Sequence, residues 1–336
     1  MTIRAFLDGI KRTVSAPGVL LGVFALTFAM ALPLAMTLRG MLRDDLGSSL
    51  AAQAAADGVN FDWWLEFLSR AAGIGTTFAP PIIGFAGVLD NIGGLMDGRF
   101  QIVPVAGALG AYLLVWTFLA GGILDRYARG RPTRALGFFG ACGMFFSRFL
   151  RLGVVAALAY GFLFTYVHPW LFENVFRNMT QDLTSERQAF AWRVLMYVIF
   201  AALLVTVNVL FDYAKVRAVV EDRRSMLGAL AASARFIRRN AGRVLGLYAL
   251  SALLFLIVIG GWALVAPGAG RPGLRMWWAF GLGQAYVTAR LFAKLQAMAS
   301  QTSLFQSSLA HAHYTAMPEP VWPESPAAET IGPARR

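Results

Sequence analysis

Long stretches without a charged side chain recur along this chain, and they constrain its fold more than any other feature. Crossing about 30 Å of hydrocarbon takes roughly 20 apolar residues in a helix. Five uncharged stretches that approach or exceed that length are predicted to be spans. A sixth reaches that length if its helix continues past Arg290 and Lys294, whose long stems extend toward lipid headgroups. The sequence therefore predicts an all-α polytopic membrane protein with six spans, at about residues 17–38, 101–124, 152–172, 194–212, 244–266 and 276–298.

The composition agrees with that prediction. Hydrophobic residues make up 57% of the chain and charged residues 14%, against about 45–50% and 25% in soluble proteins. This excludes an ordinary soluble enzyme. We predict one membrane domain over residues 1–310 and a disordered, proline-rich cytoplasmic tail over residues 311–336. The single cysteine, Cys142, excludes an intramolecular disulfide.

The basic residues assign a side to each connection, because Lys and Arg concentrate in cytoplasmic loops. With six spans and both termini inside, the predicted inner segments hold 21 of the 30 basic residues and 8 of the 18 acidic ones. Counting residues 71–89 as a further span would reverse this asymmetry, and Pro80 and Pro81 interrupt that stretch. We therefore predict an interfacial or re-entrant outer segment over residues 60–90. A composition rich in Arg, Ala and Gly favours a bacterial inner membrane.

A basic amphipathic segment precedes each odd-numbered span. Before the first span, apolar residues recur at helical spacing, and similar stripes precede the third and fifth spans. The first stripe is Ile3, Phe6, Leu7, Ile10 and Val14. Such segments are typical of short helices lying on a membrane surface. The spans then open with small residues four apart, such as Gly18 and Gly22, which favours close helix packing. The pattern predicts three helical hairpins, each entered through an interfacial helix.

The exit of the fourth span carries a motif. It reads Phe211-Asp212-Tyr213-Ala214-Lys215-Val216-Arg217-Ala218-Val219-Val220-Glu221-Asp222-Arg223-Arg224-Ser225. With the amphipathic helix that follows, this segment resembles a pattern in uncharacterised six-span bacterial integral membrane proteins. It is more loosely similar to the membrane domain that precedes some glycerophosphodiester phosphodiesterase catalytic domains. The first resemblance covers most of residues 1–310 and implies the six-span architecture without an assigned chemistry. Every predicted soluble segment is too short for a phosphodiesterase catalytic domain.

The basic residues of the inner side also indicate a partner. A juxtamembrane Lys or Arg contributes about 1 kcal/mol toward an anionic lipid surface. Most of these residues determine topology, and six arginines near the predicted interfacial helices are candidates for contact with lipid headgroups. They are Arg134, Arg148, Arg151, Arg235, Arg238 and Arg239. We predict anionic membrane lipids as partners and no nucleic acid, because the basic residues are dispersed around the spans.

A few polar residues fall near or inside the predicted spans and form a candidate intramembrane cluster. Asn208 and Asp212 close the fourth span, and Gln284, Arg290 and Lys294 follow one another along the last. Charges inside a membrane are costly and mark functional sites. One interpretation is a last helix that becomes amphipathic as it leaves the membrane. The other pairs Asp212 with Arg290 or Lys294 as a gate or proton relay.

The sequence shows no metal or cofactor motif. His311 and His313 point in different directions on a helix, which disfavours a shared metal. On the outer side, Asp90, Asp97 and His168 are the candidates for an active site. We predict a non-enzymatic scaffold or lipid-associated protein without cofactor or metal. Two alternatives stay open: a transporter of a hydrophobic or amphipathic small molecule, and a membrane-embedded enzyme that modifies lipid.

Overall fold

The computed structural model describes residues 1–47, 49–57, 60–79, 93–94, 96–97, 103–130, 132–266 and 273–311, and every regular element within these ranges is helical. The elements are α1 (Thr2–Val14), α2 (Pro17–Leu46), α3 (Ala51–Asp57), α4 (Phe61–Arg70), the 3₁₀ helix η1 (Gly73–Thr77), α6 (Val103–Arg129), α7 (Ala135–Phe162), the π-helices η2 (Leu163–Val167) and η3 (Trp170–Val175), α8 (Phe176–Thr180), α9 (Glu186–Val220), α10 (Met226–Arg239), α11 (Ala241–Val265) and α12 (Leu274–His311). Residues 80–90 of the predicted interfacial or re-entrant segment and the predicted tail from residue 312 lie outside the described residues.

Five helical segments are long and apolar enough to cross a membrane. They are α2, α6 from Gly107, the continuous course from α7 to Thr180, α9 and α11. The prediction of an all-helical chain with membrane-spanning helices is confirmed to that extent. Helix α12 has 38 residues but does not belong to this group, because Trp277, Trp278, Gln284 and Arg290 lower the hydropathy of its N-terminal half. The count of six spans stays a prediction.

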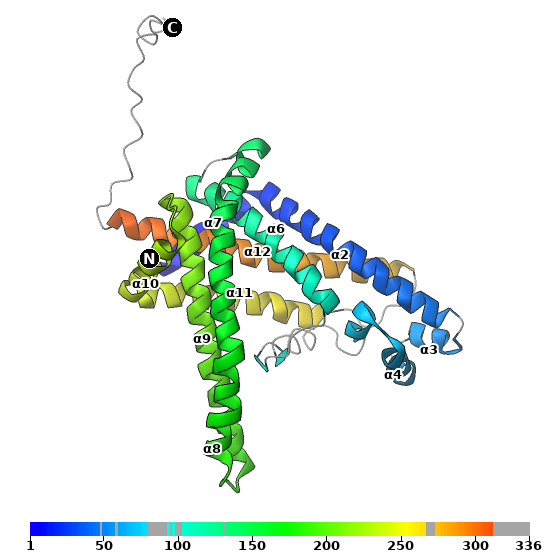
Figure 1. Ribbon diagram of the computed structural model, residues 1–336. Helices are drawn as coiled ribbons and strands as arrows, with labels where there is room; N and C mark the ends of the chain where they lie inside the picture. The colour runs from blue at the N-terminus through cyan, green and yellow to red at the C-terminus, as the bar shows by residue number, and fades with distance from the viewer. Residues whose placement is uncertain are drawn as a thin grey trace, which may run out of the picture.

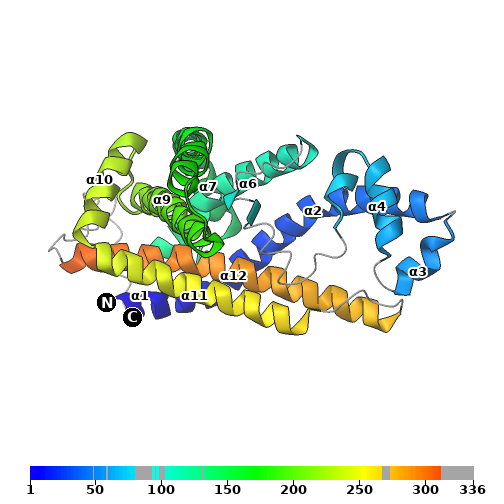
Figure 2. The same cartoon turned by 90° about the horizontal axis from the view of Figure 1, so that it is seen from below.

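The helices form two arms that diverge from one packed end (Figure 1). At the packed end, α1 and α10 meet the C-terminal halves of α6, α9 and α12 and the N-terminal half of α7. The first arm contains α2, α6, α11 and the N-terminal half of α12, and the second contains α7 to α9. Seen from below, the second arm points along the view, whereas α11 and α12 lie side by side across it (Figure 2). The predicted grouping into three hairpins would pair α2 with α6. It is not confirmed, because α6 packs more extensively against α7 than against α2.

Local sequence decides where interfacial helices separate from the long ones. Pro17 starts α2 after a break at Ala16, because a first-turn residue needs no partner for its N–H. Asn240 separates α10 from α11, with φ −124° and ψ 26°. No comparable break precedes the third predicted span, where the expected interfacial helix is instead the first part of an uninterrupted α7.

Helix α7 changes its winding near its far end. Pro169 has no N–H to donate, and its ring crowds the carbonyl one turn earlier. The π-helices η2 and η3 lie on either side of the His168-Pro169 dipeptide. They and α8 carry the helical course to Thr180, past the predicted end of the span at residue 172.

The core of the packed end is the C-terminal half of α12. Leu295, Ala299 and Leu304 are fully buried there, as are the polar side chains of Gln296 and Ser300. Helix α1 packs along this half, and Gly9 lies so close that an added Cβ would overlap Ser300. The small, polar surface of α12 is therefore covered by a small-residue face of α1.

An arginine secures this contact. The guanidinium of Arg12 donates to the Tyr127 carbonyl at 2.7 Å and to Gln306 Oε1 at 2.8 Å. Gln306 Nε2 in turn donates to the Ala128 carbonyl at 2.9 Å. These carbonyls belong to the last turn of α6, where no intrahelical donor is available and positive charge is favourable. Arg12 and Gln306 thus join α1, α6 and α12.

Close packing between α6 and α7 uses two glycines that the sequence analysis did not single out. A Cβ on Gly121 or Gly122 would meet α7 atoms at 2.5–2.8 Å, in Phe145, Cys142 and Phe138. Gly18 and Gly22, by contrast, have no atom within 4 Å of where a Cβ would stand. The prediction that these two small residues pack against other helices is wrong within the described chain.

Candidate functional site

A polar cluster occupies the region where the two arms diverge, and Asp212 of α9 is its centre. The Asp212 carboxylate forms an ion pair with Lys215 at 2.7 Å and accepts a hydrogen bond from Gln301 of α12 at 3.3 Å. Asp212 and Lys215 are half-buried, and Gln301 is buried. The hydrogen bond from Gln301 therefore connects α9 to the C-terminal half of α12.

Two tyrosines from neighbouring helices complete the cluster. Asn208 of α9 donates its amide N–H to the hydroxyl of Tyr248 in α11. Tyr160 of α7 and Tyr248 both lie near enough to Asp212 to feel its charge. Four helices therefore contribute polar groups to one place. Sequence reasoning missed both tyrosines, because tyrosine is common in apolar helices and neither lies beside a charge in the sequence.

Two cations of α12 lie beside this cluster without a carboxylate partner in the described chain. The Lys294 ammonium is 3.5 Å from the ring centroid of Trp116 in α6. Arg290, one turn away, lies 6.0 Å from the ring of Phe255 in α11 and 5.5 Å from that of Tyr286. Both side chains are exposed. Cation–π contacts are thus the interactions that hold them.

The structure brings together only part of the predicted intramembrane cluster. Asn208, Asp212 and Lys294 gather around the divergence point, and Arg290 lies at its edge. Gln284 lies farther along α12, with its backbone carbonyl accepting from Thr288. Asp212 is bonded to Lys215 and Gln301, so the direct pairing with Arg290 or Lys294 is wrong.

A second candidate site is the basic surface of the packed end. Each described carboxylate there forms an ion pair of 2.6–2.9 Å with a nearby cation. The pairs are Asp8–Arg12, Asp125–Arg129, Glu221–Arg217 and Asp222–Arg148. These carboxylates therefore do not neutralise further cations. The other arginines of this surface keep an uncompensated charge.

The six predicted headgroup arginines divide accordingly. Arg148 is engaged inside the protein, with Asp222 at 2.6 Å and the Arg223 carbonyl at 3.3 Å, and its side chain is only 12% exposed. Arg151 is exposed and donates to the carbonyl of Ser147 one turn earlier. The remaining four are exposed and have no carboxylate partner in the described ranges. They are Arg134, Arg235, Arg238 and Arg239.

Glu221 links the ends of α9 and α10. Burial alone raises the pKa of its carboxyl, but hydrogen bonds and charge from Arg217 and Arg223 outweigh burial and hold this pKa below its ordinary value. Arg217 also donates to the Ala232 carbonyl at 2.8 Å. The short turn between the two helices is therefore fixed by an ionised carboxylate.

The outer candidates lie at the far end of the second arm. His168 Nε2 is 2.8 Å from the Met96 carbonyl, and its ring packs against Phe172 at 4.6 Å between centroids. Asp97 accepts a hydrogen bond from Tyr197 at 2.5 Å. Asp90 lies outside the described residues. The contacts of His168 and Asp97 hold residues 96–97 against α7 and α9.

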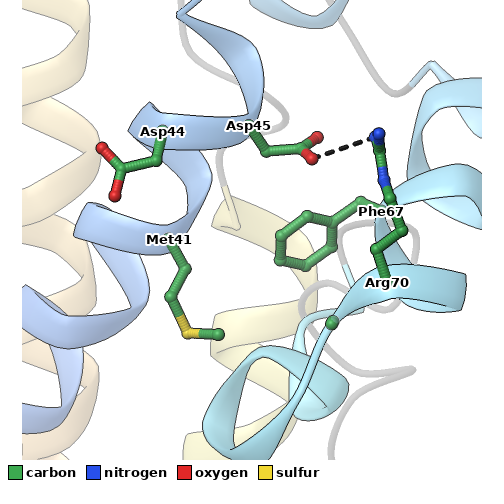
Figure 3. A pocket seen from close by; sticks show the side chains of 6 residues that line it. Met41, Asp44, Asp45, Phe67 and Arg70 are labelled. Atoms are coloured by element: carbon green, nitrogen blue, oxygen red, sulfur yellow. Dashed lines mark ion pairs between the residues drawn. The ribbon is translucent and has the colours of Figure 1, made fainter.

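A cavity of about 330 Å³ lies between the far end of α2 and α4 (Figure 3). Asp45 lines it and forms an ion pair with Arg70 at 3.0 Å, and it also accepts a hydrogen bond from Trp63 at 2.8 Å. Phe67 and Met41 form its apolar walls. Helix α4 buries Trp63 and Phe67, whose rings pack edge-on against Phe78.

Neither metal-ligating residues nor comparisons with known proteins point to a particular activity. The described residues hold no group of three or more His, Cys, Asp or Glu side chains able to bind a metal ion. His313 lies outside them. No protein-family model, curated protein or solved structure matches the chain.

Proposed function

We propose that this chain is a non-enzymatic integral membrane protein whose packed end lies at the cytoplasmic surface and binds anionic lipid headgroups. Five long apolar helices support the membrane placement. In this proposal the N-terminal half of α12 is the sixth span, and the membrane is a bacterial inner membrane. The uncharacterised six-span proteins that the sequence resembles would share this architecture.

The observation that carries lipid association is the pairing of exposed apolar and exposed basic residues on α1 and α10. On α1, Ile3, Leu7 and Val14 are 57–66% exposed, because Ala5, Gly9 and Thr13 take the inward positions. On α10, Leu227 is 68% exposed and the outward arginines follow it. A helix with this pattern inserts its apolar face among acyl chains while its cations meet the headgroups.

The strength of this association follows from charge. Each arginine near an anionic surface contributes about 1 kcal/mol, and salt screens it over about 10 Å at 0.1 M. Since the carboxylates of the packed end are paired, they do not cancel this attraction. We therefore expect the basic surface to enrich anionic lipid around the protein in a salt-dependent way.

Lipid enrichment tests the proposal. The full chain is reconstituted in vesicles of equal phosphatidylglycerol and phosphatidylcholine, extracted mildly, and its retained lipids are measured by mass spectrometry. We expect phosphatidylglycerol to be enriched, and the triple variant R235Q/R238Q/R239Q to lose most of that enrichment. The matched control R39Q/R177Q/R187Q removes three exposed arginines from the opposite ends of the arms and leaves it unchanged. Equal losses in both variants would contradict the proposal.

Cysteine labelling tests the orientation separately. Cys142 is fully buried and does not compete for a water-soluble reagent. A cysteine at Arg134 or Arg238 is expected to react only from the cytoplasmic side, and one at Arg177 only from the other side. Labelling of residue 134 or 238 from outside would overturn the orientation while leaving the fold intact.

A further inference from the structure

Arg290 and Lys294 lie at a depth where cations are rarely left without a counterion. Lys294 contacts Trp116 and Tyr112, near the middle of α6, and Arg290 contacts Phe255, the middle of α11. In a chain that spans the membrane, these contacts place both cations on the membrane side of the packed end. An isolated cation there is costly and is retained where it serves a function.

The nearest carboxylate does not neutralise this pair. Asp212 acts on Lys294 from α9, but its own ion pair is with Lys215. Counting Arg290, Lys294, Lys215 and Asp212 leaves the divergence point with a positive charge. Around it the first arm exposes aliphatic side chains, including Leu113 of α6 at 56% and Leu256 of α11 at 59%. A cationic spot thus borders a surface suited to acyl chains.

We propose that Arg290 and Lys294 bind the phosphate of one anionic phospholipid, whose acyl chains lie on the exposed aliphatic surface of α6 and α11. The proposal rests on the membrane placement of the proposed function, but the site is distinct from the basic surface of the packed end. Arg offers a planar fork of N–H donors that matches two phosphate oxygens, and Lys adds a point charge one turn away. The tyrosine hydroxyls of Tyr160 and Tyr248 lie toward the same divergence point and suit a polar headgroup.

Native mass spectrometry of the full chain tests this site, with phosphatidylglycerol as the probe and phosphatidylcholine and oleate as competitors. We expect the wild type to retain one phosphatidylglycerol after the loosely held lipids are stripped. R290Q/K294Q is expected to bind it about tenfold or more weakly, the loss that removing charged hydrogen bonds produces. The control R39Q/R43Q removes an exposed i, i+4 cation pair from α2 and is expected to bind as the wild type does.

Several outcomes would overturn the proposal. Equal retention by R290Q/K294Q and the wild type would remove these residues from the site, and preferential retention of oleate would assign it to a carboxylate. If R290Q/K294Q does not fold, the charge-preserving variant R290K/K294R is measured in its place. Competition by phosphatidylcholine and oleate is then measured on the wild type. Loss of the retained lipid in R235Q/R238Q/R239Q alone would assign it to the packed end. A wild type that enriches phosphatidylglycerol but retains none tightly would overturn this site and leave the proposed function standing.

Discussion

The C-terminal half of α12 buries polar side chains, whereas its N-terminal half exposes apolar ones. Gln296, Ser300 and Thr302 are fully buried, while Trp277 and Trp278 are 64% and 69% exposed. This inverts the rule for soluble proteins, in which buried polar groups are the exception. The polar half finds partners in α1, α6 and α9. In the proposed membrane placement the apolar half would face hydrocarbon, so the two halves of this helix would suit different surroundings.

The substitution with the largest expected effect on this contrast places a bulky residue against the polar half of α12. Gly9→Leu places a side chain where Ser300 already stands, so we expect a loss of about 3 kcal/mol in the free energy of unfolding and release of α1. Thermal unfolding in detergent measures the loss, and limited proteolysis of α1 reports the release. Gly22→Leu, in open space on α2, is the matched control and is expected to change little. Similar losses in both variants would show that α1 does not dock on α12 this way.

Removing the arginine that joins three helices should have the next largest effect. Arg12→Gln loses the hydrogen bonds to the Tyr127 carbonyl and Gln306, and we expect about 2 kcal/mol of destabilisation. Lys11→Gln alters the neighbouring exposed cation and is expected to leave the melting temperature unchanged. Equal melting temperatures of the two variants would contradict the role of Arg12 in joining the three helices.

The exposed face of α1 provides a test with a small effect on folding and a clear effect in lipid. Replacing Ile3, Leu7 and Val14 by Asn removes little intramolecular packing, because these side chains are 57–66% exposed, so stability in detergent should change by about 1 kcal/mol or less. In nanodiscs, hydrogen exchange of α1 should become faster, because the helix loses its hold on the membrane surface. Unchanged exchange in nanodiscs would mean that this face does not contact lipid.

The smallest expected effect is a pH dependence from Glu221. Its pKa in the folded protein is lowered, so its contribution to stability is complete above the ordinary carboxyl pKa and is lost as the pH falls through the folded value. The melting temperature of Glu221→Gln should therefore be below that of the wild type at neutral pH and converge with it in acid. Asp62→Asn, an exposed carboxylate of α4, should show no such convergence. A constant difference between Glu221→Gln and the wild type at all pH values would contradict this assignment.

The sequence predicted the long helices well, because uncharged length is a local property. The predicted start at residue 17 follows from a local signal, the proline there. The break that the structure shows at Asn240 likewise falls on a poor helix former. The orientation of α1 was not predictable in the same way. Its apolar stripe predicted a helix lying on a membrane surface, and nothing in that stripe indicated that the small residues Ala5, Gly9 and Thr13 would be buried. A small residue gains from contact only when its partner is also small, and that depends on α12, almost 300 residues away.

The candidate sites show the same division. Asn208, Asp212 and Lys294 were identified because polar residues are conspicuous in an apolar helix. Their actual partners could not be identified from the sequence. Asp212 pairs with Lys215 instead of Lys294 because of how α9 crosses α12. The divergence of the arms leaves no trace in hydropathy, because both arms expose similar apolar surfaces. Helix crossing is decided by contacts between distant residues, which one sequence does not display.

The bond between Arg12 and Gln306 spans 294 residues of chain. At about 5–20 residues per second, a ribosome needs roughly 15–60 s to pass from one to the other. Throughout that interval α1 has no α12 to cover its small-residue face, and in the proposed placement the exposed side chains of Ile3, Leu7 and Val14 would hold it on the membrane surface. A chain released before Gln306 is made never forms this hydrogen bond. A protease that recognises an undocked α1 would therefore distinguish unfinished chains from finished ones.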